Sequence, residues 1–302
     1  MTAFHQPVLL PEVLAAAAGA SRAVDATVGD GGHAEALRAA GAELLAIDRD
    51  PAAIRTARAR LGERGVRYLE APYASEAALQ AIASFRPDFI LLDLGVSSRQ
   101  LDEEGRGFSF RPGAPLDMRM GESGPTAAEL LNTAPEATLR GWLADFGDEP
   151  RARRLAAEIV RRRTRAPFRS SDDLVNAIRA VLGPRSGPPD FARLFQAVRI
   201  AVNAELPGLA LALPRLREAL APGGALAVLS YHSGEDRLVK HAFHEWSRSC
   251  ICPPAQPVCS CRGRPLGQTV PRGGVVAAAA EVAANPRARS ARLRVFRAAR
   301  EV

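Results

Sequence analysis

The sequence has few lysines, few aromatic residues and no long apolar run. Of its 40 basic residues only Lys240 is a lysine, and 5% of all residues are aromatic. Its apolar runs fall short of the roughly 18 residues that a membrane-spanning helix needs. The first residues lack the basic and apolar segments of a secretory signal. We therefore expect no transmembrane helix, no secretory leader and no membrane partner.

Cysteine is also scarce, and its placement is informative. A protein held together by disulfides would have them spread along the chain, so we expect a reducing, cytoplasmic location. The cysteines instead follow the pattern C-x-C-x6-C-x-C, and four thiolates so close together suit tetrahedral Zn²⁺. We assign no metal from the sequence and keep these residues as a candidate structural site, with reduced thiols or a conditional disulfide as alternatives. They are Cys250, Cys252, Cys259 and Cys261.

The rest of the composition is typical of a globular protein, with 47% apolar and 24% charged residues. The net charge of +7 is confined to one stretch. Residues 151–169 hold eight arginines and one glutamate, and the remainder balances at 32 basic and 32 acidic residues. This stretch predicts a helix that contacts an RNA backbone, because charge contacts of this kind hold phosphates. The alternative is a solvated helix face in an arginine-biased sequence.

Strand-like and helix-like segments alternate over the first 100 residues, which predicts βαβ units around a parallel sheet. Strands are expected at 22–28, 44–47, 66–70 and 88–94, and helices at 34–40, 51–61 and 76–84. The pattern then gives way to an irregular stretch and a helical one. Residues 105–124 are rich in Gly, Pro and Arg, and helices are expected at 126–132, 136–146, 151–163 and 171–182, the last with an N-cap cluster at 170–173 (SSDD).

After a breaker-rich linker at 183–189 the α/β pattern resumes. We expect a helix at 193–220 broken at Pro207-Gly208, a strand at 225–231, a helix at 235–248 and strands at 275–282 and 291–296. The predicted organisation is one α/β core, formed by residues 1–104 and 191–302, interrupted by a helical insertion at 105–190 that we interpret as an RNA-recognition domain.

A glycine-rich turn follows the first predicted strand, in the segment Asp25–His33 (DATVGDGGH). Its spacing fits neither the dinucleotide fingerprint nor a phosphate-binding loop. Asp48 ends the second strand, where a carboxylate accepts ribose hydroxyl hydrogens, and Asp93 ends the fourth strand at the same sheet edge. A glycine turn and acidic strand ends without a phosphate cradle suit S-adenosylmethionine, which carries an ammonium and a sulfonium. The alternative is a tight turn beside an unrelated Asp48.

These residues resemble the MraW family of bacterial ribosomal RNA small-subunit methyltransferases. The matching blocks lie in family order over nearly the whole chain. Beyond the glycine turn they are 5–10 (HQPVLL), 48–51 (DRDP), 92–102 (LDLGVSSRQLD), 107–110 (GFSF), 115–120 (PLDMRM), 195–206 (FQAVRIAVNAEL), 230–240 (SYHSGEDRLVK) and 285–294 (NPRARSARLR).

The resemblance implies a Rossmann-like class I methyltransferase core with a seven-stranded sheet and a helical insertion. It implies N4-methylation of one decoding-centre cytidine of 16S rRNA, with S-adenosylmethionine as methyl donor, the 30S subunit as partner and a possible homodimer. By position, it implies cofactor contacts from Gly31, Gly32, His33, Asp48, Tyr73, Asp93 and Gln100. The chain departs from the family pattern at Tyr231 and Gly234, where phenylalanine and leucine are usual, and it lacks the acid before Pro115.

Methylation at N4 needs a well-placed amine and a group that accepts one of its hydrogens. C5-methylation would need a cysteine nucleophile near the fourth strand, and the cysteines lie elsewhere. The candidate proton acceptors are Asp93, His232, Asp117 and Asp236. The alternatives are that His232 is structural, and that Asp117 and Asp236 form ion pairs with Arg119 and Arg237.

An extruded base needs aromatic and basic contacts. The candidates for substrate RNA are Phe108, Phe110, Tyr231, Arg119, Arg161, Arg162, Arg163, Arg199, Asn203 and Arg237. For the aromatic residues the alternative is an ordinary core position, and for Arg199 and Asn203 it is support of the sheet edge. Two other functions stay open: methylation of another RNA or of a small molecule, and a non-catalytic RNA-binding assembly factor.

Overall fold

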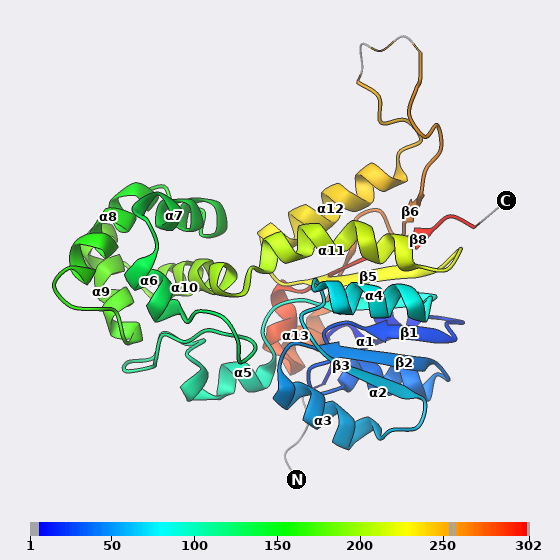
Figure 1. Cartoon of the computed structure of the whole chain (residues 1–302), viewed down its shortest axis with the longest axis horizontal. Helices are drawn as coiled ribbons and strands as arrows, with labels where there is room; N and C mark the ends of the chain where they lie inside the picture. Colours follow the sequence, from blue (N-terminus) through cyan, green and yellow to red (C-terminus); the bar gives the residue numbers. More distant parts are fainter. Residues whose placement is uncertain (1–5, 254–255, 257, 301–302) are drawn as a thin grey trace. The chain divides into compact units, whose positions relative to one another are not determined.

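The computed structural model describes residues 6–253, 256 and 258–300, and the chain divides into two compact units (Figure 1). The sheet unit is built from Met1–Gly95 and Leu206–Val302, and the helical unit is Val96–Glu205. The helical unit is wider than the predicted segment 105–190, because α10 (Pro188–Asn203) buries Phe191, Leu194 and Phe195 in its core.

The sheet unit contains one mixed sheet with the order β3-β2-β1-β4-β5-β8-β6, and the short β7 also pairs with β8. The strands from β3 to β5 are parallel, while β8 runs antiparallel to β5, β6 and β7. This topology confirms the predicted Rossmann-like class. The strands are β1 (Arg22–Asp25), β2 (Glu43–Asp48), β3 (Val66–Glu70), β4 (Phe89–Asp93), β5 (Ala225–Ser230), β6 (Gly267–Thr269), β7 (Val275–Val276) and β8 (Arg292–Ala298).

Helices cover both faces of this sheet, because alternate residues of each buried strand point to opposite sides. Leu44, Leu91 and Ala227 belong to one apolar cluster, whereas Leu45, Leu92 and Val228 belong to the other. The helices of this unit are α1 (Leu10–Ala16), α2 (Gly32–Ala39), α3 (Pro51–Leu61), α4 (Glu76–Phe85), α11 (Glu205–Ala219), α12 (Ser233–Ser247), α13 (Ala279–Ala284) and the short 3-10 helix η3 (Pro286–Ser290).

The helical unit has its own apolar core, centred on residues such as Leu131, Leu155 and Ile178. Ser170 and Asp173 form the capping box that starts α9, within the N-cap cluster that the sequence predicted. Besides α10, its elements are α5 (Ser98–Asp102), η1 (Glu104–Arg106), α6 (Ala127–Thr133), α7 (Glu136–Gly141), the π-helical turn η2 (Trp142–Phe146), α8 (Ala152–Arg163) and α9 (Ser171–Leu182).

Two sequence predictions were wrong in detail. The long helix was expected to break at Pro207-Gly208, but it breaks at Ala204, whose backbone is in the left-handed region with φ 50°. Pro207 lies in the first turn of α11, where no backbone N–H is needed for a helical hydrogen bond.

Residues 275–282 were expected to form one strand. Only Val275–Val276 does so, and the alanine-rich part forms α13, since alanine favours helix.

The sheet order reverses direction between β1 and β4, which is the switch point at which open α/β sheets bind ligands. Asp25, Asp48 and Asp93 are the last residues of β1, β2 and β4, at the carboxyl edge of the sheet. In the described residues no single helix is long and apolar enough to span a membrane. Only α10 and α11 pass that test, as a bent pair, and each is packed in a protein core.

Candidate active site

The glycine turn after β1 has a backbone that only glycine adopts readily. Gly29 and Gly31 have φ of 52° and 80°, and Gly31 is the N-cap of α2. A Cβ on Gly32 would lie 2.6 Å from the ring of Pro7. These constraints exclude side chains at the three glycine positions. The missing side chain of Gly32 also lets the N-terminal segment pack against the start of α2.

Asp48 is oriented by two backbone amides. Its Oδ2 accepts from the Gly29 N–H at 2.9 Å, and its Oδ1 accepts from the Asp50 N–H at 2.9 Å. One carboxylate therefore ties the glycine turn to the start of α3. Because each oxygen has two lone pairs, Asp48 can accept further hydrogens from a bound ligand.

Asp93 lies at the centre of a partly buried polar group. Its Oδ1 accepts from the Tyr231 hydroxyl at 2.8 Å, its Oδ2 lies 3.5 Å from His33 Nδ1, and its backbone N–H donates to Thr27 Oγ1 at 2.7 Å. Burial raises the pKa of Asp93, against the lowering effect of His33 and of Tyr231. Burial also raises the pKa of Tyr231. The Tyr231 hydroxyl thus stays a donor that fixes the Asp93 carboxylate.

Asp25 is a site residue that our sequence analysis missed. It is 1% exposed, and its carboxylate accepts a long hydrogen bond of 3.3 Å from the Thr27 N–H. Burial raises its pKa to about 8, despite Thr27, and the negative charges of Asp93 and Asp48 add to the effect. Its place at the end of β1, inside the glycine-turn motif, was the signal that could have identified it.

Three of the expected cofactor residues contact other parts of the protein itself. His33 is buried, with Nε2 2.9 Å from the Val8 carbonyl, so its ring links the N-terminal segment to Asp93. Tyr73 packs against the second apolar cluster of the sheet unit. Gln100 belongs to the helical unit, where its side chain caps α5 and its amide nitrogen donates to the Met120 carbonyl at 3.1 Å. The predicted contact of Gln100 with the cofactor stays a prediction.

His232 is the N-cap of α12. Its Nδ1 accepts from the Glu235 N–H at 3.4 Å, and its Nε2 lies 3.2 Å from a carboxylate oxygen of the buried Glu235. A Cβ on Gly234 would meet the His232 ring at 3.2 Å, so the glycine leaves room for this ring. The capping role matches the structural alternative that the sequence left open.

Asp236 has a different partner from the one expected. It receives two hydrogen bonds from Arg294, at 2.7 and 3.0 Å, and Arg294 is 5% exposed. Arg292 is a second neighbour at 3.8 Å, whereas Arg237 is exposed. The Asp236 carboxylate neutralises a buried guanidinium on β8, which favours the ion-pair alternative with Arg294 in place of Arg237. The role of Asp236 as a proton acceptor stays a prediction.

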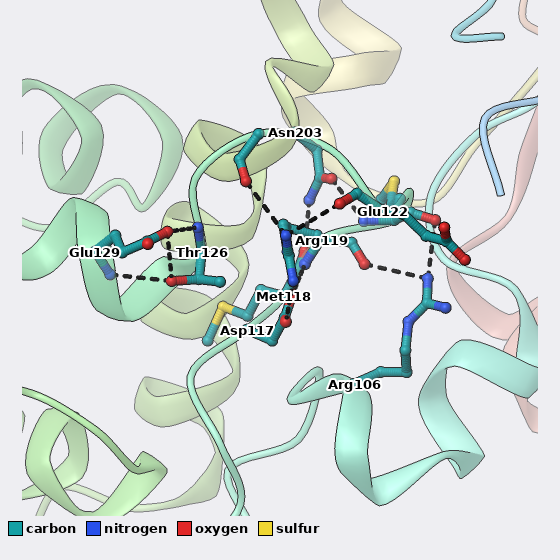
Figure 2. A network of polar contacts seen from close by, with 10 residues as sticks. Arg106, Asp117, Met118, Arg119, Glu122, Thr126, Glu129 and Asn203 are labelled. Atoms are coloured by element: carbon teal, nitrogen blue, oxygen red, sulfur yellow. Dashed lines mark hydrogen bonds and ion pairs between the residues drawn. The ribbon is translucent and has the colours of Figure 1, made fainter.

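In the helical unit, Asp117 and Arg119 form an ion pair with each other (Figure 2). Burial opposes ionisation of Asp117, but the hydrogen bonds from Arg119 outweigh it and lower the pKa of Asp117. Asn203 accepts from the Met120 N–H at 2.8 Å and donates to the Met118 carbonyl at 2.7 Å. Figure 2 shows how these side chains hold the loop before α6, so their polar groups serve that loop.

Other RNA candidates of this unit are also held internally. Arg199 makes two hydrogen bonds of 2.9 Å to Glu205. Phe108 packs against the apolar core, and Phe110 makes edge contacts with the Phe191 and Phe195 rings. The structure thus favours the core alternative for both aromatic residues.

The three arginines that end α8 are not equivalent. Arg161 and Arg162 bind Glu158, and the hydrogen bond from Arg161 is the main reason that the pKa of Glu158 falls to about 2. Arg163 donates to the Leu131 and Ala134 carbonyls, so it caps the end of α6. The exposed arginines of this stretch that have no acidic partner in the described chain include Arg153, Arg154 and Arg165.

Comparison with known proteins gives a full-length match. The sequence profile of the MraW methylase family matches residues 2–299. The chain is 58% identical over 303 residues to the ribosomal RNA small subunit methyltransferase H of Gemmatimonas aurantiaca, covering 98% of this chain and 96% of that protein. It is 48% identical over 307 residues to the protein of the same name from Rubrobacter xylanophilus, with the same two coverages. On this match over nearly its whole length, the chain belongs to the MraW methylase family.

Proposed function

We propose that this chain transfers a methyl group from S-adenosylmethionine to the exocyclic N4 of a decoding-centre cytidine in 16S rRNA. The observation that carries the proposal is the family match over residues 2–299, together with relatives that are named as small-subunit rRNA methyltransferases. The partner is then the 30S subunit, and the place of action is the cytoplasm.

The chemistry of the sheet edge fits this cofactor. The negative charges of Asp93 and Asp48 contribute to the raised pKa of Asp25, so the three carboxylates lie close enough to interact. Three acidic groups at one edge of the sheet disfavour a phosphate ligand and favour a cation. S-adenosylmethionine supplies a methyl group on a positively charged sulfonium, and it also carries an ammonium.

The roles of the chain's own residues follow from their contacts. Asp48, held by the Gly29 and Asp50 amides, accepts hydrogens from the ribose hydroxyls. The glycines of the turn let the backbone approach the rest of the cofactor. Asp93, held by Tyr231 and Thr27, accepts a hydrogen of the target amine at a carboxylate oxygen. A raised pKa suits a carboxylate for this task, because it makes the ionised form a stronger base.

RNA binding is assigned to the unpaired arginines of the helical unit. Arg153, Arg154 and Arg165 are exposed on or beside α8, so their charges are available for phosphates. Arg163 and Asn203 are left out because their side chains bind backbone groups of their own unit.

The proposal is tested by incubating the protein with S-adenosylmethionine and purified 30S subunits that lack the modification. Mass mapping of 16S rRNA nucleosides is expected to show one N4-methylated cytidine. Methylation of free nucleosides or another RNA, but not of 30S subunits, would favour the broader methyltransferase function. Absence of S-adenosylmethionine binding in calorimetry would favour the assembly-factor function.

A further inference from the structure

The four cysteines come together in the segment between α12 and β6. All four Sγ atoms lie within 4.8 Å of one another. The distances are 3.5 Å for Cys259–Cys261, 3.8 Å for Cys250–Cys259, and 3.9 Å for both Cys252–Cys259 and Cys250–Cys261. Sulfur atoms about 2.3 Å from a central zinc form a tetrahedron with edges of about 3.8 Å. Four of the six edges thus agree with a tetrahedral thiolate site to within about 0.3 Å.

From this geometry we infer that Cys250, Cys252, Cys259 and Cys261 bind one structural Zn²⁺ ion. The donor set is soft and complete, and four thiolates leave no open position for a substrate. The inference is independent of the proposed methyl transfer, because none of these residues takes part in it.

Packing does not account for the arrangement of the cysteines. Cys250 and Cys259 are exposed and the other two are half-buried. The apolar neighbours Ile251 and Val258 are 39% and 74% exposed, so they provide no core to hold the segment. Thiols of this kind gather when something binds them, because a short polar segment cannot bury enough apolar surface to order itself.

The surroundings of the sulfur atoms suit a bound metal ion in both hydrogen bonding and charge. The Ile251 N–H donates to Cys261 Sγ at 3.3 Å, a contact of the type that orients metal ligands. Residues 248–266 contain three arginines and no acidic residue. The positive charge of this stretch offsets the negative charge that four thiolates leave on a zinc complex.

The segment is also fastened at its base. Arg262 donates to the Glu245 and Arg248 carbonyls at the end of α12, and the Leu266 N–H donates to the Trp246 carbonyl at 2.8 Å. β6 then begins at Gly267, opposite Ala298, beside the amino end of β5. The cysteines therefore lie in the segment that enters the sheet at the end opposite to Asp48 and Asp93, and Figure 1 shows the described part of this segment projecting beyond α12. Such a position fits a structural ion.

The test is metal analysis of the full chain purified under reducing conditions without chelator. We expect roughly one zinc per chain. Cys259→Ser and Cys261→Ser are each expected to lose at least about nine-tenths of it, because a complete tetrahedral set tolerates no missing thiolate. Ser260→Ala, between those two ligands, is the matched control and is expected to keep its zinc.

A second measurement does not depend on how the variants fold. Wild-type protein freed of metal is titrated with Co²⁺, and the visible absorption of a tetrahedral thiolate complex is expected to saturate at about one equivalent. Chelation is also expected to speed tryptic cleavage after Arg248 and Arg262, since the closed loop opens. Absence of zinc together with a featureless cobalt titration would overturn the inference. So would iron in place of zinc, or two disulfides in the reduced preparation.

Discussion

The two units of the chain differ in how their charged side chains are arranged. In the helical unit, opposite charges pair with each other, as Asp117 does with Arg119 and Arg199 with Glu205. At the carboxyl edge of the sheet unit, like charges gather, and the pKa of Asp25 rises to about 8 as a result of burial and of its acidic neighbours. Paired charges stabilise a fold, whereas gathered like charges cost stability, which makes the sheet edge the place built for a ligand.

The largest effect is expected from removing the titrating carboxyl group of Asp25 at the sheet edge. Its raised pKa means that the folded protein keeps a proton that the unfolded chain releases above about pH 4. The free energy of unfolding should therefore fall as pH rises through this window, by about 4 kcal/mol between pH 5 and pH 8. Asp25→Asn cannot titrate and should lose this dependence. Thermal unfolding of both proteins across the pH range measures the difference, and parallel curves would contradict the prediction.

The next largest effect is expected from a paired charge within the sheet unit itself. Asp236→Ala leaves the buried Arg294 without its carboxylate and should lower the free energy of unfolding by about 3 kcal/mol. Arg237→Ala, an exposed neighbour, should change it by less than about 0.5 kcal/mol. Urea unfolding measures both. If Asp236→Ala unfolds like wild type but loses methyl transfer, Asp236 belongs with the site and its structural role is wrong.

A smaller effect, confined to binding, is expected for Asp48. Asp48→Ala removes the acceptor of two ribose hydroxyl hydrogens and should weaken S-adenosylmethionine about 100-fold, or about 2.7 kcal/mol. Glu43→Ala, at the other end of the same strand, should leave the affinity unchanged. Calorimetric titration makes the comparison. Equal affinity of Asp48→Ala and wild type would remove Asp48 from the site.

The smallest effect is expected for RNA binding by the helical unit. Replacing Arg153, Arg154 and Arg165 by alanine should weaken binding to 30S subunits about tenfold and flatten its salt dependence, because up to three phosphate contacts are lost. S-adenosylmethionine affinity should not change. The control replaces three exposed arginines of the sheet unit, namely Arg55, Arg64 and Arg86. An equal loss in both variants would mean that the net charge, and not the helical unit, directs binding.

The sequence predicted the parts of this structure that depend on local pattern. The glycine turn, Asp48 at a strand end and the N-cap cluster at 170–173 were all recognisable within a few residues. The partners of polar side chains were not, because they lie far along the chain. Asn203 binds a carbonyl 85 residues away, and Asp236 binds an arginine 58 residues away.

The same limit explains the residue that we missed and the residues that we misjudged. Asp25 reads in the sequence as the end of a strand, and its raised pKa arises only when β1, β2 and β4 place three carboxylates at one edge. Arg163 reads as part of an arginine run, although its side chain caps a helix about 30 residues earlier.

The central claim is that the acidic sheet edge binds the positively charged methyl donor. Calorimetry of S-adenosylmethionine binding near pH 8, in two buffers that differ in ionisation enthalpy, tests it most directly. A bound cation lowers the pKa of Asp25 from about 8, so binding by wild type should release a fraction of a proton, and binding by Asp25→Asn should release none. Binding without proton release in wild type, or no binding at all, would contradict the account.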